Sequence, residues 1–382
     1  MTSIKERLQP RLHAQSRLFF WILGLTLFTV AIGLVMVASA SSVDAFKATS
    51  NAGSTFFRQG GFAVIGLVLM LIASNMPMAF YRRLSMTLLL ATLGLQVATV
   101  LFGKEINGNR NWLDLGFTSI QPSEFLKLGL IIGLGYQLSL LGDYQDENTA
   151  LWKRVFVYSI GAVGLVAVLG KDMGTGIVMV VMLLGLYLLN GMSVAKWLGI
   201  IAVGGLAGWI LVTQSASRAL RFAAWLNPDA ADPMGVNWQF EKGTWALASG
   251  GIFGTGLGRS KLKWSWIPEV ENDFIFAIIG EELGMIGALM VVFLFLALGL
   301  VLYATAKAQT DPFNRNIVIG VMLWIVLQAF INIAVVLGLL PVLGVPLPLI
   351  SAGGSSLIAT LGAIGVVLAV ERDRVANLGR RK

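Results

Sequence analysis

The sequence contains no cysteine and a single histidine, His13. The absence of cysteine excludes disulfides, thiolate metal sites, iron–sulfur clusters and cysteine nucleophiles. A single histidine excludes histidine-rich metal sites and almost every histidine-dependent catalytic triad. Any catalysis by this chain therefore depends on carboxylates, lysines, arginines or hydroxyl groups.

Charged residues are also scarce. They make up 13% of the 382 residues, whereas soluble domains carry roughly 25%, and 56% of the side chains are apolar. This composition predicts a membrane protein. The 28 Lys and Arg exceed the 20 Asp and Glu, giving a net charge of +8, which is typical of chains that lie beside anionic lipid or bind anionic substrates. No nucleic acid partner is expected, because the basic residues are scattered between apolar segments.

Ten long apolar segments predict ten transmembrane helices. They cover Leu18–Ala40, Phe56–Ile72, Ser85–Phe102, Phe125–Leu141, Val155–Leu169, Thr175–Leu189, Trp197–Val212, Phe274–Ala304, Ile317–Leu340 and Leu357–Val370. The sequence thus predicts an all-α polytopic integral membrane bundle.

The distribution of basic residues predicts the orientation of this bundle. Outside the long connection 213–272, most Lys and Arg fall in the even-numbered connections and in the two tails, so both termini are predicted to be cytoplasmic. The predicted domains are an N-terminal tail at 1–17, a transmembrane domain at 18–371 and a C-terminal tail at 372–382. The connection 213–272, between helices 7 and 8, is predicted to be a large extracytoplasmic loop.

The first group of polar residues at membrane depth lies around the start of the fourth segment. Arg110 and Trp112 precede this segment, which begins with Pro122, Glu124 and Lys127. Proline suits the first helical turn, and residues three apart share one helical face. Ionisable residues at membrane depth are candidates for function. An intrahelical ion pair that shields two charges, with the tryptophan as an interfacial anchor, is the alternative.

A second polar turn, Lys171-Asp-Met-Gly-Thr-Gly176, separates the fifth and sixth segments. Each of these segments has about 15 residues, which reach only about 22 Å as helix and fall short of a hydrocarbon core of about 30 Å. The turn is therefore expected to lie below the outer headgroups, where Lys171 and backbone N–H groups could bind an anion. A tight glycine-containing hairpin is the alternative.

The long outer loop combines tryptophans with cations such as Arg218, Arg221 and Arg259. This pattern is typical of an amphipathic segment on the headgroups. The glycine-rich stretch Ser249–Gly258 allows close backbone approach to a phosphate, although it matches no dinucleotide-binding or P-loop fingerprint.

Asp273 stands where this loop enters the eighth segment. Its carboxylate could cap the helix, or it could act as a general base toward a substrate arriving from the membrane plane. Glu281 and Glu282 lie two turns deeper, so at least one is expected to be neutralised, paired or bonded to backbone. Near the end, Leu340–Ser356 contains three prolines and two adjacent glycines, which exclude regular helix, so this stretch is expected to be buried in protein or to line a water-filled cavity.

These motifs resemble the SEDS family of shape, elongation, division and sporulation proteins, whose members include FtsW, RodA and SpoVE. The resemblance covers nearly the whole chain. Four ordered motifs carry it: Asn109–Trp112 with Gln121–Glu124, Lys171–Thr175, Asn272–Ala277 with Gly280–Gly284, and Pro346–Ser355. Met36–Val43 and Arg259–Trp264 resemble the division branch, FtsW, more than the elongation branch, RodA.

The resemblance implies a peptidoglycan glycosyltransferase of the bacterial cytoplasmic membrane that acts at the division septum. Its substrate would be lipid II, the undecaprenyl-pyrophosphate-linked disaccharide pentapeptide, which it polymerises into a growing glycan strand. The implied partners are a class B penicillin-binding transpeptidase and other membrane proteins of the division machinery. No metal ligand set is visible, so a divalent cation such as Mg²⁺ would act only with the substrate pyrophosphate.

The resemblance also implies roles for individual residues. Asp273 would be the catalytic base on the acceptor sugar hydroxyl, with Lys127 as a cation that keeps it ionised. The substrate and its pyrophosphate would contact Lys127, Arg110, Lys171, Glu124, Trp112 and Arg259. The motif residues with a structural role would be Pro122, Asp172, Glu281, Glu282, Ser351, Gly353, Gly354 and Ser355.

Three alternatives remain open: a transporter or flippase of the same lipid-linked precursor, an elongation-type polymerase similar to RodA, and a noncatalytic scaffold. A transporter needs ionisable residues near the membrane midplane with access from both sides. A polymerase on the outer face needs them at the outer ends of the spans. Glu124, Lys127, Lys171 and Asp273 are all predicted to lie at those outer ends.

Overall fold

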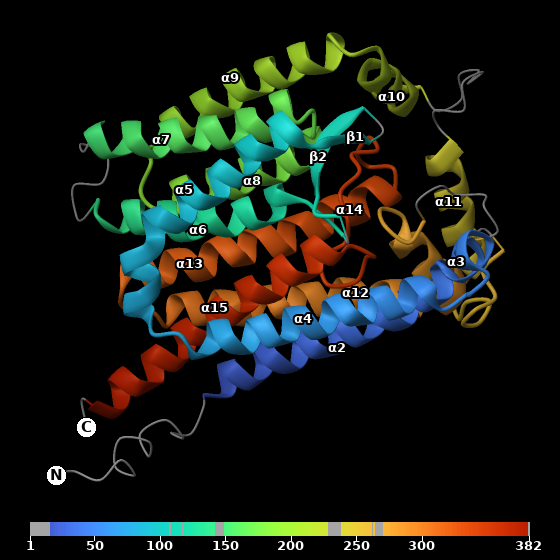
Figure 1. The fold of residues 1–382 in the computed structure, drawn as a ribbon, viewed down its shortest axis with the longest axis horizontal. Helices are drawn as coiled ribbons and strands as arrows, with labels where there is room; N and C mark the ends of the chain where they lie inside the picture. Colours follow the sequence, from blue (N-terminus) through green and yellow to red (C-terminus); the bar gives the residue numbers. More distant parts are fainter. Residues whose placement is uncertain are drawn as a thin grey trace.

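The computed structural model describes residues 16–380, except 107, 117, 142–148, 228–237, 262 and 264–269. Most of the predicted N-terminal tail, 1–17, therefore lies outside the described residues. Within them, long apolar helices pack side by side along one axis, and a small sheet lies at one end of the bundle (Figure 1).

The helices vary in length from the eight residues of α3 to the 33 residues of α12. They are α2 (Arg17–Ala40), α3 (Ser42–Thr49), α4 (Ser54–Asn75), α5 (Met78–Phe102), α6 (Pro122–Ser139), α7 (Thr149–Val163), α8 (Met173–Leu189), α9 (Val194–Thr213), α10 (Ala216–Leu226), α11 (Trp238–Gly250), α12 (Ile275–Lys307), α13 (Pro312–Met322), α14 (Gln328–Val336) and α15 (Gly354–Arg380). Two π-helical segments, Gly164–Leu169 after α7 and Leu323–Leu327 between α13 and α14, continue these helices.

The three short strands form an antiparallel sheet in the order β1-β2-β3. They are β1 (Lys104–Ile106), β2 (Asn109–Asp114) and β3 (Ser119–Ile120). Lys104 pairs with Trp112, and Leu113 pairs with Ile120. The sheet connects α5 to α6 and so carries the segment that contains Arg110 and Trp112.

Each of the ten predicted spans coincides with a helix, or with a helix continued by a π-helical segment, although the ends differ. Among the described residues, eight helical segments are long and apolar enough to cross a membrane. The other two, α6 and α8, have 18 and 17 residues. The all-α polytopic membrane bundle is thus confirmed, while ten complete crossings stay a prediction.

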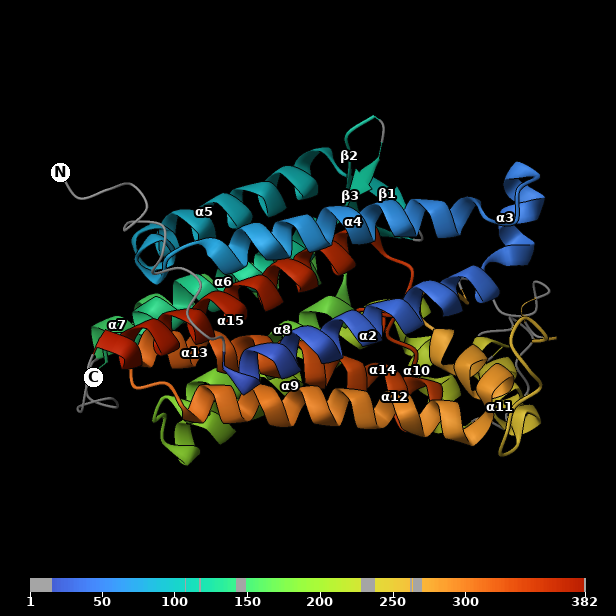
Figure 2. The same cartoon turned by 90° about the horizontal axis from the view of Figure 1, so that it is seen from below.

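Successive spanning helices run in alternating directions, so their connections gather at two ends of the bundle (Figure 2). The start of α2 and the end of α15 share one end with the α4–α5, α8–α9 and α12–α13 connections. The helices α3, α10 and α11 and the three strands lie at the opposite end, which we call the loop end. The sequence predicts that the loop end is extracytoplasmic.

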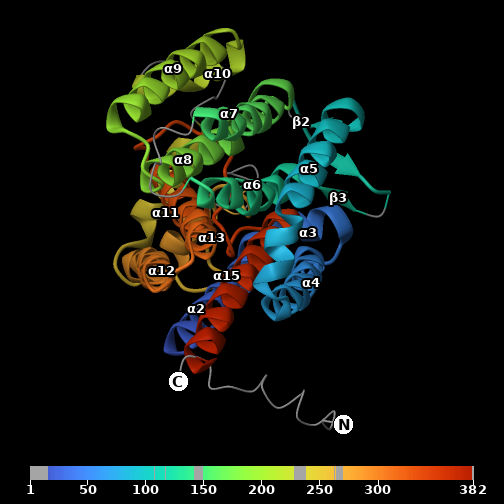
Figure 3. The same ribbon diagram turned by 90° about the vertical axis from the view of Figure 1, so that its left-hand side faces the viewer.

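The core lies along α15, which packs against α4 and also contacts α2, α6 and α13. Of the apolar stretch of α15, 83% is buried, in agreement with its central position in the end-on view (Figure 3). By contrast, α9 lies at the periphery and buries none of its residues. Large apolar side chains such as Phe57, Val203 and Leu206 remain exposed around the bundle, as expected where lipid replaces water.

The long helix α12 is interrupted at Gly284, where φ is 69° and the backbone is not helical. Here the loop after α11 comes close: the Thr255 N–H donates to the carbonyl oxygen of Glu281 at 2.9 Å. A Cβ on Gly284 would lie 2.3 Å from the backbone nitrogen of Gly254, so only glycine fits. Asp273 therefore precedes a short helical piece that ends at this break, and the same loop also bonds the residues that follow, since the Met285 N–H donates to the carbonyl oxygen of Gly251 at 2.9 Å.

Candidate functional site

A cavity of about 940 Å³ opens at the loop end. Helices α8 and α10, the sheet, the residues before α12 and the proline-containing segment before α15 all contribute to it. Its charged and amide side chains are Glu105, Asn109, Asn111, Gln121, Lys171, Asp172, Gln214, Arg218, Arg221, Gln239, Asn272 and Asp273. The cavity thus brings three cations and three carboxylates together.

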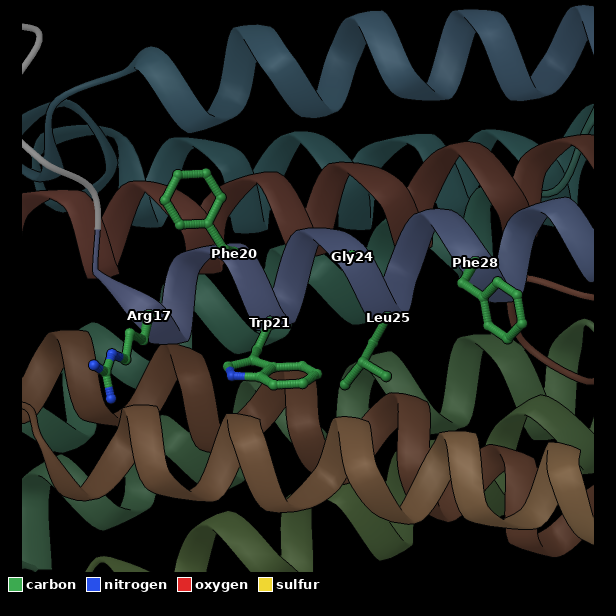
Figure 4. A pocket seen from close by; sticks show the side chains of 6 residues that line it. All are labelled: Arg17, Phe20, Trp21, Gly24, Leu25 and Phe28. Atoms are coloured by element: carbon green, nitrogen blue, oxygen red, sulfur yellow. The ribbon is translucent and has the colours of Figure 1, made fainter.

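A second hollow lies on α2, close to its start (Figure 4). Its lining consists of Arg17, Phe20, Trp21, Gly24, Leu25 and Phe28. Among the described residues, this lining is mostly apolar and includes one cation and no carboxylate. The described lining thus offers no acid–base pair, so the cavity at the loop end is the candidate functional site.

Asp273 lines the cavity, is partly exposed and lies two residues before the start of α12. The sequence allowed Asp273 to cap α12, but the structure places Phe274 at the capping position. A Cβ on Gly344 would lie 3.5 Å from the Asp273 Oδ2 atom, and Gly344 has a φ of 69°. The left-handed backbone therefore favours glycine at this position, and a side chain here would contact the carboxylate.

Three cations line the cavity, and we call Lys171, Arg218 and Arg221 its basic group. The Lys171 Nζ atom lies 3.5 Å from Glu105 Oε1, and both side chains are about half exposed, at 51% and 47%. Solvent screening makes such a pair weak, so an anionic ligand can displace it. The Arg218 guanidinium donates to the carbonyl oxygen of Lys171 at 3.3 Å, which joins α10 to the turn before α8.

Arg110 lies beside this group and does not line the cavity in the part of the chain that the structure describes. Its Nη2 atom is 3.8 Å from Glu105 Oε2, and its Nη1 atom donates to the carbonyl oxygen of Val100 at 3.3 Å. Glu105 therefore separates Arg110 from Lys171. Trp112, by contrast, lines the cavity.

Three of the sequence motifs meet around Asp172. Its Oδ1 atom accepts a hydrogen bond from the Thr175 N–H at 3.0 Å and caps α8, as expected for an aspartate at a helix start. Its Oδ2 atom accepts one from the Gln121 side chain at 3.2 Å, and the Gln121 N–H donates to Ser355 Oγ at 2.9 Å. Pro122 follows as the first residue of α6, as predicted.

The Ser351–Ser355 turn fixes the residues next to Asp273. Ser351 Oγ donates to the carbonyl oxygen of Asn272 at 2.5 Å and accepts from the Leu347 N–H at 2.8 Å. Gln59 of α4 donates to the Ser351 carbonyl oxygen and accepts from the Gly353 N–H, both at 3.2 Å. Gly353 and Ser355 line the cavity. Gly354 begins α15, where a Cβ would lie 2.6 Å from the ring of Phe62.

Glu124 and Lys127 form a buried ion pair outside the described lining of the cavity. The Lys127 Nζ atom lies 2.8 Å from Glu124 Oε1 and 2.9 Å from Gln328 Oε1, and 4.7 Å from the centre of the Trp324 ring. Both charged side chains are 1% exposed. Neither residue is among the described lining residues. The sequence predicted that both residues contact the pyrophosphate directly. In the structure they contact each other, and Lys127 also contacts Trp324 and Gln328, because their shared helical face is turned toward these residues.

Glu281 and Glu282 are buried and tied to the loop after α11, which confirms the expectation that at least one is paired or bonded to backbone. The Lys261 N–H donates to Glu281 at 2.9 Å, and the Ser39 hydroxyl donates to Glu282 at 2.7 Å. The Lys263 Nζ atom lies 3.5 Å from Glu282. Both glutamates thus hold the loop against α12.

The glycine-rich stretch Ser249–Gly258, whose glycines allow close backbone approach, packs against α12. A Cβ on Gly250 would lie 1.9 Å from the carbonyl oxygen of Gly280. The glycines therefore permit contact between two backbones. Arg259, which follows them, is exposed and is not among the described lining residues of the cavity, so the predicted pyrophosphate contact of Arg259 is not supported.

No three His, Cys, Asp or Glu side chains converge as metal ligands within the described residues. A Mg²⁺ ion would there depend mainly on oxygens of the substrate, since it favours oxygen ligands and keeps several waters. The involvement of a divalent cation stays a prediction.

Two side chains that were not predicted from the sequence form hydrogen bonds to the backbone of the site. Gln328 and Asn332 lie four residues apart within the apolar segment Ile317–Leu340, and each is 1% exposed. Gln59 likewise interrupts the second apolar segment. Amides within these apolar segments were the available signal, because a buried amide needs partners.

Comparison with known proteins identifies the family. A model described as "cell cycle protein", for FtsW, RodA and SpoVE, matches residues 17–376. The chain belongs to this FtsW/RodA/SpoVE family. Stage V sporulation protein E of Bacillus subtilis is 38% identical over 357 residues, which cover 91% of this chain and 95% of that protein. The probable peptidoglycan glycosyltransferase FtsW of Mycobacterium tuberculosis is 36% identical over 353 residues, which cover 91% and 67%.

Solved structures of the FtsW/RodA/SpoVE family share the fold. RodA of Thermus thermophilus matches with a TM-score of 0.71 at 27% identity and covers 95% of this chain and 98% of that one. A chain from a peptidoglycan synthase complex, described as coordinating polymerization and crosslinking, matches with a TM-score of 0.74 at 27% identity, covering 95% and 99%. The family resemblance that the four motifs predicted is thus confirmed, and an FtsW-like member agrees with the names of the relatives.

Proposed function

We propose that this chain is a peptidoglycan glycosyltransferase that polymerises lipid II into glycan strands on the outer face of the bacterial cytoplasmic membrane. The observation that carries the proposal is that Asp273 and the basic group line the same cavity at the loop end. Relatives named peptidoglycan glycosyltransferase, at 36% identity over most of the chain, support it.

The chemistry requires one base and several cations. Asp273 takes the proton from the acceptor sugar hydroxyl while the hydroxyl oxygen attacks the anomeric carbon of the donor. The bond between this carbon and the pyrophosphate oxygen breaks, and the pyrophosphate leaves with the electron pair. Because pyrophosphate is already a good leaving group, no second carboxylic acid has to protonate it. The cations stabilise the negative charge that grows on the leaving group.

We assign the pyrophosphate contact to Lys171 and Arg218, with Arg221 beside them. Arg218 is linked to Lys171 through the Lys171 carbonyl oxygen, so both cations lie at one side of the cavity. Glu105 neutralises part of their charge before the substrate binds. Lys127 has an indirect role in this assignment, since its charge is already paired with Glu124.

Replacing Lys171 and Arg218 together with Gln is expected to lower polymer formation at least about tenfold, or about 1.4 kcal/mol in transition-state stabilisation. The full-length protein is purified with its transpeptidase partner, given labelled lipid II, and the glycan products are separated by gel. Lys153→Gln, on an exposed cation at the start of α7 far from the cavity, is the control. Polymer formation at the wild-type rate in the double variant would contradict the assignment. Movement of lipid II across liposomes by a wild-type protein that makes no polymer would favour the transporter.

Gly344→Ala is expected to slow polymerisation several-fold without unfolding the protein. The added methyl would lie 3.5 Å from Asp273 Oδ2, and the left-handed backbone adds roughly 1–2 kcal/mol of strain. Gly251→Ala is a matched control, because Gly251 also has a positive φ, of 55°, and a Cβ there would meet nothing within 4 Å. Rates per folded molecule are compared by the same gel assay. Equal rates in the two variants would show that the methyl does not disturb the carboxylate.

The division role and the partners belong to this proposal. The proposed partners are a penicillin-binding transpeptidase of class B and other division proteins, and the proposed location is the division septum. The proposed catalytic transmembrane domain is 18–371, which contains the extracytoplasmic loop 213–272. Residues 372–382 form a proposed cytoplasmic tail. The similarity to a chain of a peptidoglycan synthase complex and the FtsW names of relatives support them. A noncatalytic scaffold would tolerate loss of Asp273, which separates it from the enzyme.

A further inference from the structure

Two side-chain amides of the ninth apolar segment, Asn332 and Gln328, donate hydrogen bonds to the backbone of segments that line the cavity. Asn332 uses both hydrogens of its amide: Nδ2 donates to the carbonyl oxygen of Asp273 at 2.8 Å and to that of Val345 at 2.7 Å. One bond thus reaches the backbone of the carboxylate residue. The other reaches the residue after Gly344, which lies beside that carboxylate.

Gln328 makes the equivalent contact one helical turn earlier. Its Nε2 atom donates to the carbonyl oxygen of Pro346 at 3.0 Å. Its Oε1 atom accepts from Lys127 Nζ and from Trp324 Nε1, each at 2.9 Å. The buried ion pair of α6 is therefore connected to the lining of the cavity through a single glutamine.

The proline-containing segment needs these donors. Pro341, Pro346 and Pro348 have no N–H group and exclude a regular helix, so the carbonyl oxygens around them need partners from elsewhere. Two consecutive carbonyls, of Val345 and Pro346, receive them from two amides four residues apart on one helix. The π-helical segment Leu323–Leu327 directly precedes these amides, and such segments are frequent at functional sites.

We propose that Asn332 and Gln328 are positioning residues that hold Asp273 and residues 344–346 together as one rigid side of the cavity. The inference rests on the proposed function. Asn332 fixes the backbone from which the carboxylate projects, so it affects the rate of the chemical step. Gln328 fixes Pro346, which lines the cavity one step further from the carboxylate, so it affects substrate binding. A displacement of about 1 Å at a reacting group can cost about a hundredfold in rate.

A buried amide with a purely structural role is available for comparison. Asn316 of α13 is 0% exposed, and its Nδ2 atom donates to the carbonyl oxygen of Gly135 at 3.1 Å. It joins α13 to α6 and does not line the cavity among the described residues. Asn316→Leu removes an amide of the same size and burial, whose hydrogen bond within the described part of the chain goes to α6 and not to the cavity lining.

The experiment measures lipid II polymerisation by the full-length protein with its transpeptidase partner, over a range of lipid II concentrations, per folded molecule from size-exclusion chromatography. Asn332→Leu is expected to lower kcat at least about tenfold and to change KM less than about threefold. Gln328→Met is expected to raise KM at least about threefold and to change kcat less than that. Asn316→Leu is expected to keep both values, even where it lowers thermal stability.

Asn332→Asp provides a second test for the same position. It keeps the shape of the side chain but replaces the donor with an acceptor that faces two carbonyl oxygens, so kcat is expected to fall as in Asn332→Leu. Wild-type kcat in either folded variant would overturn the inference, as would an equal loss in Asn316→Leu. Failure of both Asn332 variants to fold would also overturn it, by showing a structural role. Absence of polymer from the wild-type protein would overturn the proposed function and this inference with it.

Discussion

Asp273→Asn is expected to abolish glycan polymerisation, with a loss of at least about a hundredfold in rate, because the amide cannot accept the proton of the acceptor hydroxyl. The substitution changes one atom of a partly exposed side chain, and the backbone carbonyl of residue 273 keeps its bond from Asn332. Folding and binding to the transpeptidase are therefore expected to persist. Asp273→Ala is expected to give the same loss. The measurement is polymer formation from labelled lipid II on gels.

The control for this prediction is Asp373→Asn, which removes a carboxylate from α15 at the other end of the bundle, where it accepts a hydrogen bond from Asn377. That variant is expected to polymerise at the wild-type rate. Polymer formation by Asp273→Asn at more than about a tenth of the wild-type rate would exceed what a lost general base allows and would assign the base elsewhere.

Lys127→Met is expected to lower the free energy of unfolding by about 3–5 kcal/mol, the cost of leaving one member of a buried ion pair without its partner. The Glu124 carboxylate would stay buried at 1% exposure with its cation removed, and its Oε2 atom already lacks a hydrogen-bond partner among the described residues. Gln328 would also lose a donor. Thermal unfolding in detergent measures the effect, and the polymerisation rate is expected to fall at least about tenfold.

The double variant Glu124→Gln with Lys127→Met is the control for the ion pair. It removes both charges, so most of the lost stability is expected to return, and the difference between single and double variants gives the coupling energy. A single variant as stable as the wild type would show that the pair is not buried as described. A double variant no better than the single one would show that the lost lysine packing, rather than charge, sets the cost.

The membrane fold and much of the site could be predicted from the sequence. Apolar runs report contact with lipid directly, so the ten segments coincide with helices. The positions of Lys171 and Asp273 at the ends of such segments placed both at the same end of the bundle, where they line one cavity. Asp172 and Pro122 carry local signals, since an aspartate caps a helix and a proline suits its first turn.

The direction in which buried side chains point could not be predicted. A spacing of three places Glu124 and Lys127 on one face, but only the packing of α6 against its neighbours decides whether this face meets the cavity or the core. Glycine permits close approach to a phosphate and to another backbone alike, so Ser249–Gly258 gave no indication that α12 is its partner. The amides Gln328 and Asn332 were visible as polar residues, but their carbonyl partners come from segments that only the tertiary structure brings near.

The break at Gly284 has a mechanical consequence. A bilayer that thickens or thins acts on the long apolar part of α12, residues 285–307, and such helices respond by tilting. The loop after α11 holds both sides of the break: the Thr255 N–H donates to the carbonyl oxygen of Glu281 and the Met285 N–H donates to that of Gly251, both at 2.9 Å. We therefore expect the loop to resist a tilt of this part before the tilt reaches the residues next to Asp273. The proposed catalytic geometry is then expected to vary less with lipid composition than the tilt does.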